Sequence, residues 1–128
     1  MQPETVSRWL ALFESGDMTG LDTLLAEDAV FMSPVVHTPQ AGKAITTKYL
    51  ATAHKVLGNA SFTYTGMWWN ETSAVLEFEV MVDGIAVNGV DMFAWNGSGR
   101  ITSFKVMIRP LKAINLIHGL MRDALMAA

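Results

Sequence analysis

The chain has 128 residues, of which 51% are hydrophobic and only 16% are charged, whereas an average soluble domain carries roughly 25% charged residues. Twelve acidic residues outnumber nine basic ones, and the basic residues form no cluster, so we expect no nucleic-acid partner. The length predicts a single domain over residues 1–128, and the composition leaves apolar surface for a core, a pocket or a subunit interface.

The sequence also argues against a membrane partner, a metal and a cofactor. No apolar run reaches the roughly 18 residues of a membrane-spanning helix, and residues 1–4 do not resemble a signal peptide, so we expect a cytoplasmic protein. Cysteine is absent and the three histidines are widely spaced, so we expect no metal. No glycine-rich nucleotide motif occurs, and we therefore expect no cofactor.

Apolar residues at helical spacing predict the helices. The first apolar face has members at positions i, i+3, i+4 and i+7, which are Val6, Trp9, Leu10 and Phe13. This face predicts a helix that ends at Gly16. Similar patterns predict a short helix at residues 21–25, a third helix at residues 42–57 and a C-terminal helix that begins at Pro110.

From residue 61 onward the hydropathy period changes to two, which predicts an antiparallel β-meander. Its four strands are expected at residues 62–69, 74–82, 85–95 and 101–109. Asp83-Gly84 predicts a two-residue hairpin turn between the second and third strands. A short strand at residues 29–32 precedes a loop at residues 33–40 that contains two prolines. N-terminal helices packed on such a meander, with a C-terminal helix, predict an α+β fold.

Alternation along these strands separates the side chains of two sheet faces. The face predicted to lie under the helices is mostly apolar and includes Asp91 and Phe93. The outer face combines methionine with acidic and basic residues, which are Glu77, Glu79, Met81, Met92, Lys105, Met107 and Arg109. Cross-strand charge pairs and adaptable Met side chains suit a homodimer interface, which is the assembly that we expect. The alternative is a solvated face with paired charges.

Several short motifs follow one another in a specific order. They are Glu-Ser-Gly-Asp at residues 14–17, Leu-Ala-Glu-Asp-Ala-Val-Phe at residues 25–31, Ser33-Pro34 with Gly42-Lys43, and Gly-Val-Asp at residues 89–91 ahead of Gly-Arg-Ile at residues 99–101. Together with the order of the elements, they resemble the nuclear transport factor 2-like superfamily, which includes SnoaL-like polyketide cyclases, ketosteroid isomerases and limonene epoxide hydrolases. The resemblance implies a curved sheet in a cone-shaped, cystatin-like roll.

The resemblance also implies a role for Asp91. In the isomerases the acid at this position stays protonated and donates a hydrogen bond to a developing oxyanion. The isomerase base, an Asp before the loop proline, is replaced here by Ser33, and the Tyr that is the second oxyanion donor is replaced by Trp9. The epoxide hydrolases would need an Arg near Phe78 and an acid near Arg109, and neither is present. Neither reaction therefore transfers directly to this chain.

The expected catalytic pair is Asp91 with His37, a histidine that follows Pro34 in the loop and would act as the base. The alternative is that His37 is a surface residue, and His54 and His118 are interpreted as structural. The expected ligand-binding cavity is mostly apolar, and its residues are Trp9, Phe13, Ser33, Tyr49, Trp68, Phe78, Phe93, Phe104 and Ile108. Each of these could instead belong to the core, and the pattern does not decide whether Trp68 or Trp69 faces the cavity.

Two functions from different classes fit these residues. The first is a small-molecule binding protein or a cofactor-independent enzyme of isomerase, cyclase or hydratase type, in which a proton is transferred on a hydrophobic, carbonyl-bearing ligand. Asp91 would then act as an acid or an oxyanion donor. The second is a noncatalytic dimeric module for ligand binding or scaffolding, in which Asp91 is structural.

Overall fold

The computed structural model describes residues 1–127. Its helices are α1 (Glu4–Ser15), η1 (Met18–Gly20), α2 (Leu21–Leu24), α3 (Lys43–Leu57) and α4 (Leu111–Ala127). Its strands are β1 (Leu25–Met32), β2 (Gln40–Ala41), β3 (Thr63–Trp69), β4 (Ser73–Val82), β5 (Ile85–Trp95) and β6 (Ile101–Arg109). The predicted α+β fold is confirmed, with helices before and after the strands of the meander.

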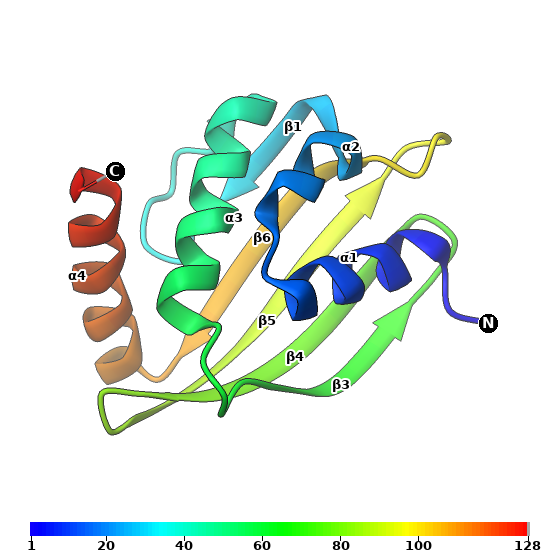
Figure 1. Cartoon of the computed structure of the whole chain (residues 1–128). Helices are drawn as coiled ribbons and strands as arrows, with labels where there is room; N and C mark the ends of the chain where they lie inside the picture. The colour runs from blue at the N-terminus through cyan, green and yellow to red at the C-terminus, as the bar shows by residue number, and fades with distance from the viewer. Residues whose placement is uncertain (128) are drawn as a thin grey trace.

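All the strands belong to one sheet, in the order β2-β1-β6-β5-β4-β3. The segment from β3 to β6 is the predicted antiparallel meander, and Asp83 and Gly84 both have positive φ in the turn between β4 and β5. The sheet as a whole is mixed, because β1 pairs in parallel with β6, as Figure 1 shows. This parallel pairing was not predicted, and β1 is longer than expected because it begins directly after α2.

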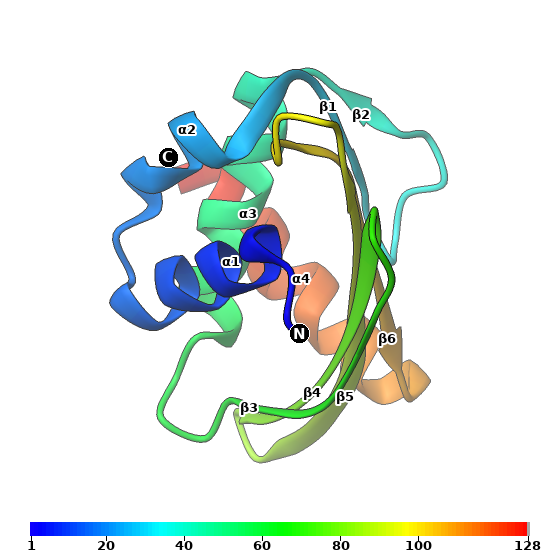
Figure 2. The ribbon, with the colours of Figure 1, turned by 90° about the vertical axis from the view of Figure 1, so that its right-hand side faces the viewer.

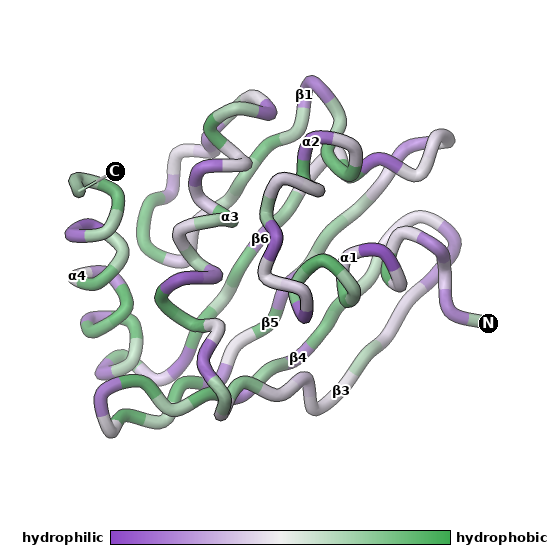
Figure 3. The backbone as a smooth tube through the Cα atoms, viewed as in Figure 1, coloured by the Kyte–Doolittle hydropathy of each residue, from purple (hydrophilic) through white to green (hydrophobic). Residues whose placement is uncertain are grey.

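The sheet is curved, and α1, α2 and α3 lie on its concave side (Figure 2). This inner face carries the predicted buried residues, including Leu76, Phe78 and Phe104. The last helix, α4, follows β6 and packs against α3, and Figure 3 shows that hydrophobic and hydrophilic residues alternate along it. No helix in residues 1–127 has the length and hydropathy that are needed to cross a lipid bilayer.

A β-bulge in β3 reverses the alternation of its side chains. Tyr64 pairs with Phe78 on the inner face, but the register shifts before Gly66. Trp68 therefore pairs with Val75 on the outer face, and it is 59% exposed. The expectation that Trp68 faces the cavity is wrong, because a one-residue shift turns all the following side chains of a strand to the other face.

Gly89 of β5 leaves room for the ring of Phe78. A methyl group at residue 89 would lie 2.5 Å from Phe78 Cζ and 2.7 Å from the backbone oxygen of Met107. Gly89→Ala should therefore lower the free energy of unfolding by about 1–3 kcal/mol, as measured by urea denaturation. Gly97→Ala is the matched control, because no atom lies within 4 Å of its added methyl group. Equal stabilities of the two variants would contradict this account of the packing.

Candidate active site

A cavity of about 330 Å³ opens between the inner sheet face and helices α1, α3 and α4. This volume lies within the range of small-molecule sites, and the walls are almost entirely apolar. The structure places most of the predicted site residues in these walls, namely Trp9, Phe13, Ser33, Tyr49, Phe78, Asp91, Phe104 and Ile108. The topology therefore brings together one buried carboxyl group and a set of aromatic rings.

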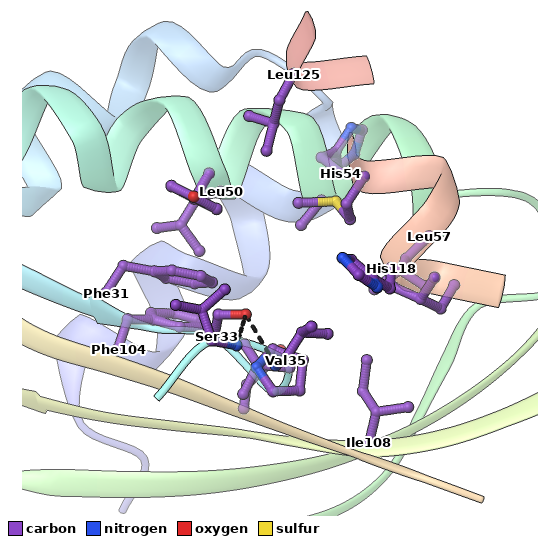
Figure 4. A pocket seen from close by; sticks show the side chains of 18 of the residues that line it. Phe31, Ser33, Val35, Leu50, His54, Leu57, Phe104, Ile108, His118 and Leu125 are labelled. Carbon is purple, nitrogen blue, oxygen red and sulfur yellow. Dashed lines mark hydrogen bonds between the residues drawn. The ribbon is translucent and has the colours of Figure 1, made fainter. Parts of the chain in front are cut away.

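Figure 4 shows how the walls are arranged. Phe31 and Phe104 lie on one side of the cavity, and Val35 lies below its centre. His118 projects from α4 toward the interior, and Leu125 closes the wall farther along the same helix. The C-terminal helix thus contributes both polar and apolar side chains to the site.

The loop between β1 and β2 turns at Ser33. The hydroxyl oxygen of Ser33 accepts hydrogen bonds from the backbone N–H groups of Val35, at 3.0 Å, and Val36, at 3.3 Å. Both valines line the cavity, whereas His37 is exposed and lies outside its wall. The expected pair of Asp91 and His37 is therefore not brought together, because the turn presents the valines to the cavity and leaves His37 in solvent.

A chain of hydrogen bonds ends at the carboxyl group of Asp91, which is only 7% exposed. Tyr64 donates a hydrogen bond to Asp91 Oδ2 at 2.6 Å, and Trp9 Nε1 donates to the Tyr64 hydroxyl oxygen at 3.0 Å. Because an indole N–H group can only donate, the Tyr64 oxygen accepts from Trp9 and directs its own hydrogen to Asp91. The hydrogen bonds therefore run in one direction, from Trp9 on α1 through Tyr64 on β3 to Asp91 on β5.

This environment favours a protonated Asp91. Burial raises the pKa of Asp91 from 3.8 to about 7, although the hydrogen bond from Tyr64 lowers it. Burial, together with the nearby Asp91 charge, raises the pKa of Tyr64 well above its usual value, so Tyr64 keeps its hydrogen. Since Tyr64 already supplies the hydrogen at Asp91 Oδ2, a proton on the carboxyl group belongs on Oδ1, where it can be donated to a ligand.

Tyr64 is a candidate site residue that the sequence analysis missed. It lies in a strand segment that was predicted correctly, and its register before the bulge turns it to the inner face. A Tyr hydroxyl on a buried face needs a hydrogen-bond partner. That rule, applied to Tyr64 and to the inward-facing Asp91 together, is the signal that would have suggested their contact.

The wall formed by α4 was also missed. Its lining residues recur at helical spacing and are Ile117, His118, Met121, Arg122, Leu125 and Met126. Such spacing predicts an apolar helix face but does not show whether that face packs against the core or borders a cavity. The interpretation of His118 as a structural residue reflects this ambiguity, and the structure places His118 in the cavity wall.

His54 also lines the cavity, but its ring is engaged elsewhere. Its Nε2 atom lies 3.1 Å from the carbonyl oxygen of Phe13, and because a carbonyl oxygen can only accept, Nε2 carries the hydrogen. The Phe13 ring meets the His54 ring edge-on, with centroids 4.9 Å apart. His54 thereby ties α3 to the last turn of α1, where backbone carbonyl groups lack helical partners.

Phe93, which was expected in the cavity wall, lies behind it. Its ring stacks on Phe104, with centroids 5.3 Å apart and an interplanar angle of 7°, and it also contacts Trp9 at 6.1 Å. Phe93 therefore supports two lining rings from behind. The sequence left open whether Trp68 or Trp69 faces the cavity, and the structure shows that neither belongs to its wall.

The cavity wall carries few charges. Within the described part of the chain, its charged side chains are Asp91 and Arg122, and Arg122 Nε lies 3.4 Å from a carboxylate oxygen of Asp123. No group of three His, Asp or Glu side chains in residues 1–127 could hold a metal ion. The chemistry that these residues can supply is hydrogen bonding and proton transfer.

Comparison with known proteins identifies the family. The sequence model of a family described as a SnoaL-like domain matches residues 6–104. The chain belongs to this SnoaL-like family. The structure of a steroid delta-isomerase from Pseudomonas aeruginosa is similar over 96% of this chain and 90% of that one, with 34% sequence identity and a TM-score of 0.91. The predicted resemblance to the nuclear transport factor 2-like superfamily is thereby confirmed.

Two further solved structures share the fold. An uncharacterised bacterial protein with a cystatin-like fold, from Silicibacter pomeroyi, is 30% identical over 97% of this chain and 84% of that one, with a TM-score of 0.82. SalBIII, an epoxide hydrolase/cyclase-like enzyme of pyran ring formation in salinomycin, is 18% identical over 83% of this chain and 88% of that one, with a TM-score of 0.66. At this lower identity SalBIII shows the fold alone.

The raised pKa of Asp91 predicts a specific pH dependence of stability. Between pH 3.8 and about 7 the folded chain retains a proton that an unfolded chain has released, so the free energy of unfolding falls as the pH rises through this range. Asp91→Asn removes this loss. The free energy of unfolding of the variant should be closest to that of the wild type below pH 4. Above pH 7 it should exceed the wild-type value by on the order of 4 kcal/mol, since one pKa unit corresponds to about 1.36 kcal/mol.

Urea denaturation at a series of pH values measures this difference. Asp17→Asn provides a comparison of opposite sign, because hydrogen bonds from the Thr19 side chain and backbone lower the pKa of Asp17. The Asp17 carboxylate therefore stabilises the fold at neutral pH, and this stabilisation is lost in acid. A difference between Asp91→Asn and the wild type that does not change with pH would show that the carboxyl group is not perturbed by burial.

Proposed function

We propose that the protein is a cofactor-independent enzyme that acts on a hydrophobic small molecule bearing a carbonyl group. The observation that carries this proposal is the Asp91 carboxyl group, which lies in the cavity wall, has a pKa raised to about 7 and already receives a hydrogen bond at Oδ2. A protonated carboxyl group in an apolar site donates a strong hydrogen bond to an oxygen atom that gains negative charge.

A carbonyl oxygen is the ligand group that matches this donor. When a proton leaves the carbon beside the carbonyl group, the oxygen becomes an enolate oxygen, and its charge is stabilised by the hydrogen bond from Asp91. This hydrogen bond strengthens as the charge develops, so it lowers the barrier more than it stabilises the bound ligand. Tyr64 and Trp9 hold the carboxyl group in place beforehand, so little reorganisation is needed during the reaction.

The rest of the cavity favours a rigid, apolar ligand. Aromatic rings, including those of Phe31, Phe78 and Phe104, form much of the wall, and planar or fused-ring ligands gain contact area against such surfaces. The Pseudomonas aeruginosa relative is named a steroid delta-isomerase, which supports a ketosteroid as the first ligand to test. The substitution of the isomerase base by Ser33 means that the proton acceptor must lie elsewhere.

The donor role of Asp91 can be tested with a β,γ-unsaturated ketosteroid, whose isomerisation to the conjugated enone is followed by ultraviolet absorbance. Asp91→Ala removes the donor and should lower kcat by about 10²–10³. Asp91→Asn should retain more activity, because its side-chain oxygen can accept from Tyr64 while its NH₂ group still donates to the ligand. Thermal unfolding of each variant controls for lost structure. Equal losses in the two variants would indicate that Asp91 acts as a base, contrary to the proposal.

We also propose that the protein is a homodimer through the outer sheet face. Large apolar side chains are exposed there, with Met81 49%, Met107 50% and Trp68 59% exposed. Apolar surface of this kind on a folded chain is typical of an interface. The same observation supports the alternative function, a noncatalytic dimeric binding module, in which the Asp91 variants would change ligand affinity but no turnover would be detected.

The charges of the outer face are arranged differently from the expected direct ion pairs. Asn88 donates to Glu77 Oε2 at 3.0 Å and accepts from Arg109 at 3.4 Å, so an amide group lies between the opposite charges. The ion pairs found among residues 1–127 join other residues. In the proposed dimer, Glu79 and Lys105 are placed to pair with a second copy of the chain.

Met107→Glu tests this assembly. A carboxylate in the middle of the apolar patch should convert the dimer to a monomer, because a buried unpaired charge is costly. Sedimentation at micromolar concentration should give twice the monomer mass for the wild type and the monomer mass for this variant. Met126→Glu, at an exposed position of α4, should remain dimeric. A monomeric wild type would show that the outer face is solvated.

A further inference from the structure

The proposed reaction needs a group that removes a proton from carbon, and the cavity wall limits the choice. Besides Asp91, its titratable or hydroxyl-bearing side chains within residues 1–127 are Ser33, Tyr49, His54, His118 and Arg122. An acceptor must have an available lone pair and sufficient basicity at neutral pH. Arg122 has no acceptor atom, and the Tyr49 phenol must first lose its own proton before it can accept one.

Two of the remaining groups are already engaged. The Ser33 hydroxyl oxygen accepts two backbone hydrogen bonds in the loop turn, and a serine hydroxyl is not basic without a partner. The His54 ring donates from Nε2 to the carbonyl oxygen of Phe13. It is also enclosed, because a methyl group at Gly58 would lie 3.1 Å from His54 Nε2 and one at Gly16 would lie 3.4 Å from its Cε1 atom.

His118 is in a different situation. Its ring projects from α4 into the cavity (Figure 4), and no hydrogen bond to the ring is formed within residues 1–127. The backbone of α4 is held against the core next to His118, since Ala113 and Ile117 are buried there. His118 is also exposed to solvent at the cavity edge, so a proton that it removes can exchange with water.

We propose that His118 is the general base of this site, an inference that rests on the proposed function of Asp91. An imidazole nitrogen of His118 removes the proton from the carbon beside the ligand carbonyl group. The C–H bond breaks, an N–H bond forms, and the C–H electron pair becomes the new C=C bond while the carbonyl π electrons move to oxygen. The resulting enolate oxygen accepts the hydrogen bond from Asp91.

The imidazolium group of His118 then returns the proton. Delivery to the same carbon regenerates the ligand, and delivery to the far carbon of a conjugated enolate moves the double bond. Protons and electrons balance in both cases, and no further reactant is required. The donor comes from the sheet and the acceptor from the C-terminal helix, so the ligand reacts between the two layers of the fold.

Deuterium exchange tests the base directly. A saturated ketosteroid in D₂O can exchange the hydrogens beside its carbonyl group but cannot isomerise, and mass spectrometry measures the deuterium gained. His118→Gln should lower the exchange rate by about 10²–10⁴. Asn115→Gln, an exposed position on the same helix, is the matched control and should exchange at the wild-type rate, as should His37→Gln.

Chemical rescue separates a base from a structural residue. His118→Ala should be inactive in plain buffer and should recover exchange when imidazole is added, which a merely structural role would not produce. If Asp91→Ala loses exchange while His118→Gln retains it, or if His37→Gln is the inactive variant, the base assignment is overturned and the proposed function stands. If the wild type does not accelerate exchange or isomerisation, the proposed function fails, and the assignment of His118 fails with it.

Discussion

The hydrogen bond from Tyr64 to Asp91 is the interaction on which the site depends. A carboxyl group buried among aromatic rings is costly unless it is protonated or hydrogen-bonded, and Asp91 is hydrogen-bonded and has a pKa that burial raises to about 7. The contact requires β3 to curve toward the helices and α1 to cross the concave side of the sheet (Figure 2), because Trp9 completes the chain of donors. Removing any member would leave a buried polar group unpaired, so the three elements form one cooperative unit.

Local patterns were sufficient to predict most of the fold. The periods of 3.6 and 2 residues identified α1, α3 and the strands of the meander, and Asp83-Gly84 identified the turn with two positive φ angles. Two features were not predicted, the parallel pairing of β1 with β6 and the bulge in β3. Both concern register between segments, which depends on the partner strand as well as on the segment itself. The bulge has a large effect, because it lets one strand place Tyr64 on the inner face, beside Asp91, and Trp68 on the outer face.

The site was predicted less completely, for a related reason. Asp91 could be found from the sequence because a charged residue in an inward strand register is unusual. The cavity itself could not, since apolar residues have the same spacing whether they fill a core or border an empty volume. This ambiguity hid the contribution of α4 and made His37, in a polar loop beside the expected pocket, the more attractive histidine. The turn at Ser33 is a four-residue geometry that composition does not reveal, and it presents Val35 and Val36 to the cavity in place of His37.

The replacement of the isomerase base by Ser33 has a physical consequence for the proposed reaction. The loop after β1 contributes apolar wall to the cavity and no base, because the Ser33 hydroxyl accepts backbone hydrogen bonds in the turn and Val35 and Val36 line the cavity. In the proposed reaction the base, His118, lies on α4, a helix that follows the sheet and is anchored by the buried side chains of Ala113 and Ile117. The distance between acid and base is then set by how α4 packs against α3 and the sheet. A small change in that packing moves His118 relative to Asp91 without altering the carboxyl group or its pKa. The position of the C-terminal helix therefore determines which carbon of a bound ligand lies within reach of the base, whereas the sheet determines where its oxygen binds.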